Sequence, residues 1–165
     1  MATSVELARV LVANAAYASR AHRSGLPAPP SRRLAVLACM DARLDVAAAL
    51  GLGQGEAHVI RNAGGLATDD ALRSLVVSHR LLGAETVLVI GHTGCGMLGL
   101  DESAARRELI AATGVAVDLP LLGFEDLEAS IRAQVERIRS HPWLRGLRAH
   151  GVVFDVETGR LRALD

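Results

Sequence analysis

The sequence predicts an α/β protein with a central, mostly parallel β-sheet flanked by helices, an antiparallel C-terminal edge strand and an N-terminal helical arm. Short apolar runs alternate along the chain with longer segments of helical periodicity, the pattern typical of this class. The runs 34–39 and 86–90 are almost entirely apolar, as expected for parallel strands buried on both faces. The length of 165 residues fits one domain spanning 1–165, with the arm at 1–30.

The first third of the chain contains the arm and two strands. A helix is expected over residues 4–22, because Leu7, Val10 and Leu11 recur on one face. Residues 25–31 hold three prolines and therefore form a stiff connector that cannot continue the helix. The elements expected next are a strand at 34–39, a short helix at 44–50 and a strand at 57–61.

Helices and strands continue to alternate in the remainder. Thr68 is expected to cap a helix whose first turn contains Asp69 and Asp70, favourable at the positive end of the helix dipole. The later elements expected, in chain order, are a strand at 86–90, a helix at 101–112, a loop at 113–123, a helix at 125–140 and a hairpin formed by 151–156 and 161–164.

Composition narrows the class of protein. Basic and acidic residues balance at 18 each, which gives no support for nucleic-acid binding or for a polybasic membrane contact. No apolar run approaches the ~20 residues that span a bilayer, so no membrane segment is expected. The two cysteines, Cys39 and Cys95, are too few for a disulfide scaffold and indicate reduced thiols in a cytoplasmic protein.

Three potential metal ligands follow two of the expected strands. Cys39 ends the strand at 34–39, and His92 and Cys95 follow the strand at 86–90. Functional sites of open α/β sheets form outside the carboxyl ends of the strands, so the three side chains meet if these strands are neighbours. Two cysteines and one histidine match a catalytic zinc site with an open fourth position. The alternative is two buried, structural cysteines and a histidine that bonds the backbone.

Asp41 and Arg43 lie in the turn that follows Cys39. Asp41 could be a fourth metal ligand that closes the site. Alternatively, Arg43 could hold Asp41 as an ion pair, because a guanidinium matches a carboxylate, and the site would then stay open to water. A solvated charge pair without a function is the third interpretation.

Three motifs in order carry a family resemblance: Cys-Met-Asp-Ala-Arg at 39–43, Arg-Asn-Ala-Gly at 61–64 and Gly-His-Thr-Gly-Cys-Gly at 91–96. Together with the C-terminal segment 151–161 they resemble the β-class carbonic anhydrases, most closely the short branch found in actinobacteria. The resemblance implies reversible hydration of carbon dioxide to bicarbonate and a proton, by one zinc ion per chain held by Cys39, His92 and Cys95. It also implies that Asp41 and Arg43 form the catalytic pair.

The resemblance further implies a homodimer or a dimer of dimers, in which residues 1–30 pack on the partner subunit. The substrate cleft is expected to include Asn62, Ala63, Gly64, Gly65 and Gly96. The plant-like branch of the family supplies a glutamine and aromatic side chains to its cleft, and no matching Gln or Phe precedes Cys39 here, which suggests a more apolar cleft.

Two other functions remain open at this point. One is hydrolysis of carbonyl sulfide or carbon disulfide at the same zinc site, which an apolar cleft would suit. The other is not enzymatic: a closed structural zinc site in a dimeric interaction protein, with Asp41 as the permanent fourth ligand.

Overall fold

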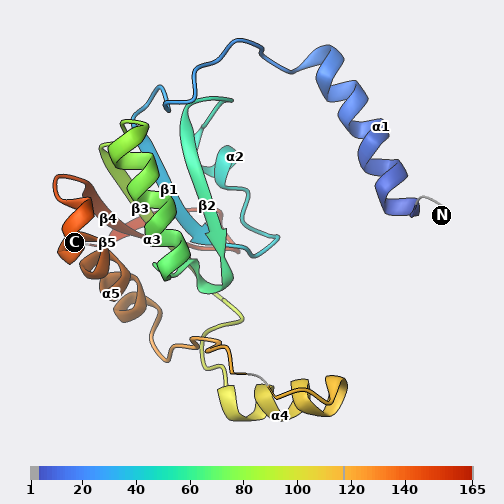
Figure 1. Ribbon diagram of the computed structural model, residues 1–165, viewed down its shortest axis with the longest axis vertical. Coiled ribbons are helices and arrows are strands. Elements are labelled where there is room, and N and C mark those ends of the chain that lie inside the picture. The colour runs from blue at the N-terminus through green and yellow to red at the C-terminus, as the bar shows by residue number, and fades with distance from the viewer. Residues whose placement is uncertain (1–3, 117, 165) are drawn as a thin grey trace.

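The computed structural model describes residues 4–116 and 118–164, which form one five-stranded sheet with helices around it (Figure 1). The strand order is β2-β1-β3-β4-β5, and only the pairing of β4 with β5 is antiparallel. The strands are β1 (Leu34–Cys39), β2 (Ala57–Asn62), β3 (Thr86–His92), β4 (Arg148–Phe154) and β5 (Leu161–Leu164). The predicted fold class and the antiparallel C-terminal edge are confirmed.

Side-chain caps fix where the helices begin. At each of the five N-termini a Ser, Thr or Asp side chain accepts a hydrogen bond from the backbone N–H three residues later. The helices are α1 (Val5–Arg20), α2 (Val46–Leu50), α3 (Asp69–Val76), α4 (Glu102–Thr113) and α5 (Leu127–Ser140). The chain also contains three short helical turns, at Ala63–Gly65, Val77–Leu81 and Pro142–Leu144.

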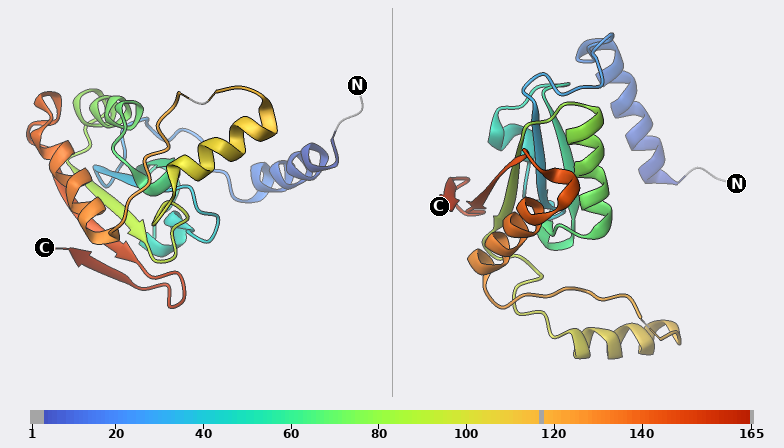
Figure 2. Two further views of the ribbon diagram at one scale, coloured as in Figure 1. Left: turned by 90° about the horizontal axis from the view of Figure 1, so that it is seen from below. Right: turned by 60° about the vertical axis from the view of Figure 1, so that its left-hand side comes forward.

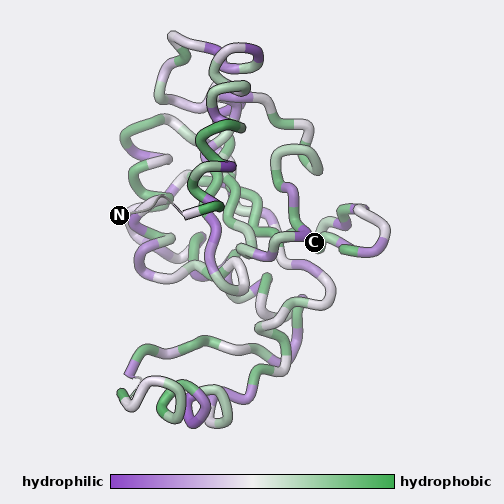
Figure 3. Tube along the Cα trace, turned by 90° about the vertical axis from the view of Figure 1, so that its right-hand side faces the viewer, coloured by the Kyte–Doolittle hydropathy of each residue, from purple (hydrophilic) through white to green (hydrophobic). Residues whose placement is uncertain are grey.

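Two hydrophobic clusters lie on the two faces of the sheet. The helices α3 and α5 bury their apolar residues against one face, and Figure 2 shows both on that side. Val46 of α2 and the preceding Leu44 pack on the other face, against Val36 and Ile90. Figure 3 shows the hydrophobic strands at the centre of the molecule. Packing on both faces explains why β1 and β3 read as nearly continuous apolar runs in the sequence.

Two glycines allow α5 to approach the sheet closely. A Cβ placed on Gly91 of β3 would lie 2.6 Å from Cδ1 of Ile131. A Cβ placed on Gly151 of β4 would lie 2.8 Å from Cγ2 of the same isoleucine. Ile131 of α5 is almost fully buried. The absence of a side chain at these two strand positions therefore sets the distance between helix and sheet.

Several boundaries differ from the sequence prediction by one to three residues, and two of the differences arise from strand pairing. The strand β4 begins at Arg148, three residues earlier than predicted, because Arg148 pairs with Thr86 at the start of β3. The strand β3 runs on to His92, which pairs with Phe154. Both extensions arise from pairing between distant strands, which local apolar patterns do not report.

The helices α1 and α4 stand away from the sheet (Figures 1 and 2). Neither helix has a buried residue among those described. Within the described part of the chain, none of the helices is both long and apolar enough to cross a lipid bilayer.

The approach of α5 generates a stability prediction. Gly151→Ala should lower the free energy of unfolding by about 1–3 kcal/mol, because the new methyl overlaps Ile131. Chemical denaturation measures the loss. Measured in an Ile131→Ala background, the same Gly151→Ala change should cost less, since the overlapping atom is absent there. Gly53→Ala is the matched control, because its Cβ would make only ordinary contacts. Equal losses at both glycines would contradict the packing argument.

Candidate metal centre

The central strands β1 and β3 bring the candidate ligands together. They pair in parallel, so both end at the same edge of the sheet. Cys39 is the last residue of β1 and His92 is the last residue of β3. Cys95 follows three residues later, after a tight turn in which Gly94 has a positive φ of 62°. The adjacency on which the sequence argument depended is therefore present.

The three side chains form a compact, buried cluster. The Sγ atoms of Cys39 and Cys95 are 4.0 Å apart, and the three potential ligand atoms all lie within 4.8 Å of one another. Exposed fractions are 5% for Cys39, 6% for Cys95 and 0% for His92. The cysteines are free thiols, and their separation suits two ligands of one ion rather than a disulfide.

The hydrogen bonding of His92 leaves one ring nitrogen for a ligand. Its Nδ1 lies 3.0 Å from the carbonyl oxygen of Thr93, which accepts a hydrogen bond only from a protonated Nδ1. The lone pair of the neutral ring is then on Nε2. This Nε2 is buried and has no hydrogen-bond partner among the described residues. A metal ion would satisfy this otherwise unpaired atom.

The chemistry of the thiols also fits a metal cation. Burial in apolar surroundings raises the pKa of Cys95, because the thiolate is poorly solvated there. A cation held between the two sulfur atoms would compensate that cost and keep both cysteines as thiolates. The donor set, the burial and the unpaired Nε2 therefore agree in fitting a metal ion that prefers sulfur and imidazole.

Asp41 and Arg43 form a two-pronged ion pair beside the cluster. Arg43 donates from Nε to Oδ1 (3.0 Å) and from Nη2 to Oδ2 (2.7 Å), and its backbone N–H also donates to Oδ1 (2.9 Å). These bonds hold the pKa of Asp41 well below its usual range, so the carboxyl is ionised. Its Oδ2 lies 3.8 Å from Nε2 of His92. This arrangement matches the second alternative considered from the sequence, in which Arg43 holds Asp41 as an ion pair and the metal site stays open to water.

Two contacts of the site were not anticipated from the sequence. Nη2 of Arg43 also donates to the carbonyl oxygen of Gly94 (2.8 Å), which joins the two ligand-bearing loops. Arg61 donates to the carbonyl oxygens of Cys39 (2.9 Å) and Asp41 (2.7 Å). The sequence offered one signal for Arg61, its place in the 61–64 motif, but no local pattern indicates which carbonyl oxygen an arginine will reach.

The expected cleft residues lie beside the cluster. Asn62 shapes the turn after β2, because its side chain both donates to the carbonyl oxygen and accepts from the N–H of Leu66. Gly65 touches the first ligand strand: a Cβ there would lie 2.9 Å from the backbone nitrogen of Cys39. Ala63 and Gly64 continue the same turn. Gly96 is exposed, with open space where a side chain would be.

Two further histidines lie within hydrogen-bond distance of oxygen atoms elsewhere in the protein. His58 lies within hydrogen-bond distance of the Ser78 hydroxyl (2.8 Å) and of the carbonyl oxygen of Ala28 (3.1 Å). His79 lies equally close to the carbonyl oxygens of Ala84 (2.7 Å) and Arg145 (3.2 Å). Neither belongs to the Cys–His–Cys cluster.

The fold and the cluster together define an α/β protein with three side chains that could hold a metal ion at the carboxyl edge of its sheet. A family model described as "Carbonic anhydrase" matches residues 34–115, which contain all three cluster residues. "Beta-carbonic anhydrase 1" of Mycobacterium tuberculosis is 43% identical over 152 residues, covering 92% of this chain and 93% of the relative. The chain therefore belongs to the β-class carbonic anhydrase family and is an enzyme.

Other relatives and solved structures agree on the fold and widen the range of activities. A "Carbon disulfide hydrolase" of Acidithiobacillus thiooxidans is 37% identical, covering 81% of this chain and 78% of the relative. The crystal structure of carbonic anhydrase from Streptococcus mutans superposes with a TM-score of 0.94 at 37% identity, and each chain is covered completely. The carbonic anhydrase from Glaciozyma antarctica gives a TM-score of 0.88 at 40% identity, covering 98% and 99%.

The cluster predicts metal binding that depends on each of its members. The purified protein should contain one metal ion per chain, and Cys39→Ser or Cys95→Ser should lose most of it, because a hydroxyl is a poorer soft-metal ligand. His92→Ala should have the same effect, with His141→Ala as the matched control. Elemental analysis measures the content. Full metal retention in the cysteine variants would exclude the cluster as the binding site.

Proposed function

We propose that this chain catalyses the reversible hydration of carbon dioxide to bicarbonate and a proton, with one zinc ion held by Cys39, His92 and Cys95. The unpaired Nε2 of His92, buried beside two free thiols, carries this proposal. Zinc is the ion that two sulfur ligands and one imidazole suit best, and three protein ligands leave a fourth position for a reactant.

The residues beside the cluster supply orientation and proton handling. When bound, zinc supplies the Lewis acidity that makes water nucleophilic near neutral pH. Asp41 is ionised and can accept a hydrogen bond from the attacking water at Oδ2, the oxygen that faces His92. Arg43 fixes the direction of that acceptor with two hydrogen bonds. The side chain of Asp41 is 18% exposed, which gives the released proton a path to solvent.

Hydrolysis of carbon disulfide or carbonyl sulfide is the second candidate activity. The relatives named carbon disulfide hydrolase support it. Measuring the turnover of all three substrates by the zinc-loaded enzyme separates the two activities. A third candidate is a closed structural site with Asp41 as a ligand. It predicts that the protein holds its full zinc content and turns over none of the three substrates.

The compartment and the assembly are also inferred. Cys39 and Cys95 must stay reduced to hold a metal, which favours the cytoplasm. Every described residue of α1 is exposed, including apolar Leu7, Val10 and Leu11, and Figure 3 shows the hydrophobic positions along this helix. Because an apolar surface of this kind is unfavourable in water, we infer that α1 packs on a second copy of the chain, in a homodimer or a dimer of dimers.

The Asp41–Arg43 pair predicts that its loss lowers the catalytic rate without removing the bound zinc. Asp41→Asn should keep zinc and lower kcat at least a hundredfold, the usual contribution of a positioned acid–base group. Arg43→Ala should also retain zinc and lose activity, because Asp41 is then free to turn toward the metal. Stopped-flow assays and elemental analysis measure the two effects, with Asp45→Asn as the matched control. Wild-type rates in both variants would remove the pair from the mechanism.

The exposed arm predicts that activity depends on assembly. A variant lacking residues 1–30 should be monomeric or aggregated and lose most of its activity although its metal ligands are intact. Analytical ultracentrifugation and the hydration assay test this together. In the full-length chain, Val10→Glu combined with Leu11→Glu should shift the equilibrium toward monomer. A soluble, fully active monomer without the arm would show that neither the arm nor the dimer is needed.

A further inference from the structure

One arginine beside the candidate ligands bonds, among the described residues, only to main-chain carbonyl oxygens. Arg61 is the next-to-last residue of β2 and lies opposite Ala38 of β1 in the register. Its Nε donates to the carbonyl oxygen of Cys39 (2.9 Å) and its Nη2 donates to that of Asp41 (2.7 Å). No carboxylate in the described part of the chain forms an ion pair with it. The guanidinium therefore acts on the path of the main chain and not on a neighbouring charge.

The segment that Arg61 holds has little side-chain packing of its own. Met40, which precedes Asp41, is 66% exposed. The backbone N–H of Met40 donates to the carbonyl oxygen of Asn62 (2.9 Å), which adds a bond from the end of β2 to the two that Arg61 makes. Hydrogen bonds from β2, rather than burial, therefore fix the main chain that leads into Asp41.

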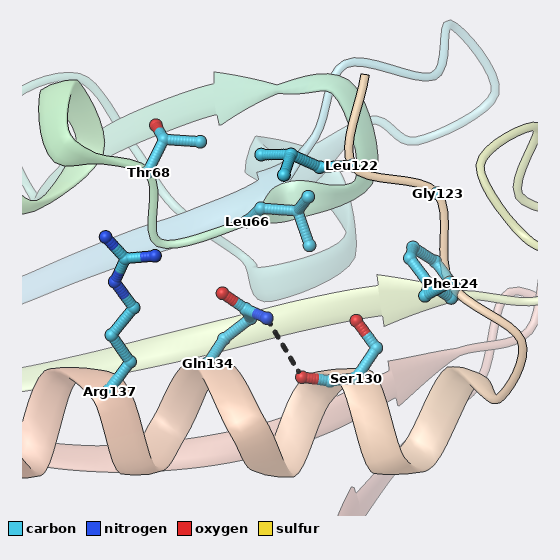
Figure 4. Close-up of a pocket in the computed structure, with 8 residues that line it drawn as sticks. All are labelled: Leu66, Thr68, Leu122, Gly123, Phe124, Ser130, Gln134 and Arg137. Atoms are coloured by element: carbon cyan, nitrogen blue, oxygen red, sulfur yellow. Dashed lines mark hydrogen bonds between the residues drawn. The ribbon is translucent and has the colours of Figure 1, made fainter. Parts of the chain in front are cut away.

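The end of β2 that carries Arg61 is itself anchored to the rest of the fold. The side chain of Asn62 both donates to the carbonyl oxygen and accepts from the N–H of Leu66. The next N–H, that of Ala67, donates to Oε1 of Gln134 on α5 (3.0 Å). Figure 4 shows Gln134 pointing from α5 toward the segment that carries Leu66. Arg61 therefore extends from a fixed base, and its two bonds determine where the carbonyl oxygens lie.

The carboxylate of Asp41 lies close to the candidate ligands. Its Oδ2 is 3.8 Å from Nε2 of His92, the unpaired atom that fits a metal ion. The two hydrogen bonds from the guanidinium of Arg43 hold the carboxylate away from that position. Such bonds weaken steeply when their angles change, so they require the main chain of Asp41 to stay in place. The bond from Arg61 to the Asp41 carbonyl oxygen meets this requirement.

We propose that Arg61 is a positioning residue, which holds the main chain of Asp41 so that its carboxylate stays on Arg43 and leaves the fourth metal position open. This inference rests on the proposed function and adds the contact that keeps the site open to a reactant. Without Arg61, the carbonyl oxygen of Asp41 loses its 2.7 Å hydrogen bond and keeps only the 3.0 Å bond from the N–H of Leu44. The carboxylate then turns toward the metal and closes the site.

The first measurement compares carbon dioxide hydration by Arg61→Ala, by Asp41→Ala and by the variant with both changes, all zinc-loaded and full-length. Arg61→Ala alone should lower kcat about tenfold or more, the usual effect of removing a group that orients a metal site. In the Asp41→Ala background the same change should cost little more, because no carboxylate is left to turn. Equal losses in both backgrounds would overturn the proposal, since the effect would not pass through Asp41.

Arg80 provides a matched control away from the metal centre. Its Nε donates to the carbonyl oxygen of Trp143 (2.8 Å) and its Nη2 donates to that of Arg145 (3.0 Å). This is the same pair of bonds to carbonyl oxygens two residues apart, but in the segment after α5. Arg80→Ala should leave the hydration rate unchanged. A loss as large as that of Arg61→Ala would contradict a role specific to the metal centre.

A binding measurement gives a readout that does not depend on turnover. Thiocyanate is a small anion that binds zinc where a position is open, and calorimetry yields its Kd for the zinc-loaded protein. The Kd should rise about tenfold in Arg61→Ala, as expected if the open form falls to about a tenth of the population. It should return close to the wild-type value when Asp41→Ala is added. An unchanged Kd in Arg61→Ala, or wild type that does not bind thiocyanate, would contradict the proposal.

The proposed function and the role of Arg61 can fail separately. Wild type that holds zinc but does not hydrate carbon dioxide would refute the proposed function, whereas the thiocyanate comparison would still decide the role of Arg61. Elemental analysis gives the zinc content of each variant. Should Arg61→Ala fold poorly, Arg61→Lys decides by the same comparison, because an ammonium keeps the charge but cannot donate as a fork to two carbonyl oxygens. Wild-type rate and Kd in that variant would then overturn the proposal.

Discussion

The parallel pairing of β1 with β3 is the constraint on which the rest of the structure depends. It ends two buried strands side by side and so brings Cys39 within reach of His92 and Cys95. The hydrophobic clusters on both faces hold this pairing, because each contains residues of both strands. Arg43 and Arg61 then fix the loops that continue from the strand ends. The pairing of the strands therefore brings the candidate ligands together, and the polar contacts only orient the loops that carry them.

The sequence predicted the sheet and the cluster for a physical reason. Strands buried on both faces must be apolar throughout, so the runs 34–39 and 86–90 were visible; Cys39 ends the first, and His92 lies two residues beyond the second. The helix starts were equally visible where a cap such as Thr68 precedes an acidic first turn. The start of β4 was missed because Arg148 and His150 are polar, and they are extended only by pairing with β3.

The parts of the site that the sequence left undecided depend on contacts between distant segments. Whether Asp41 bonds Arg43 or turns toward a metal depends on side-chain rotation, and the observed pair is reinforced by Gly94 from the second ligand loop. The bonds of Arg61 to the carbonyl oxygens of Cys39 and Asp41 likewise join segments that are far apart in the sequence. Neither contact has a local pattern, and neither could be recognised before the loops were placed.

The close seating of α5 has a consequence for how the chain can vary. Gly91 immediately precedes His92, yet the need for glycine there comes from Ile131 of α5 on the face of the sheet. The residue beside the imidazole is thus restricted by helix packing and not by the reaction. A descendant that abandoned catalysis would be free to replace both thiols, but it would still need this glycine unless α5 were rebuilt. A glycine retained at this position would then be evidence of the packing between α5 and the sheet and not of catalytic activity.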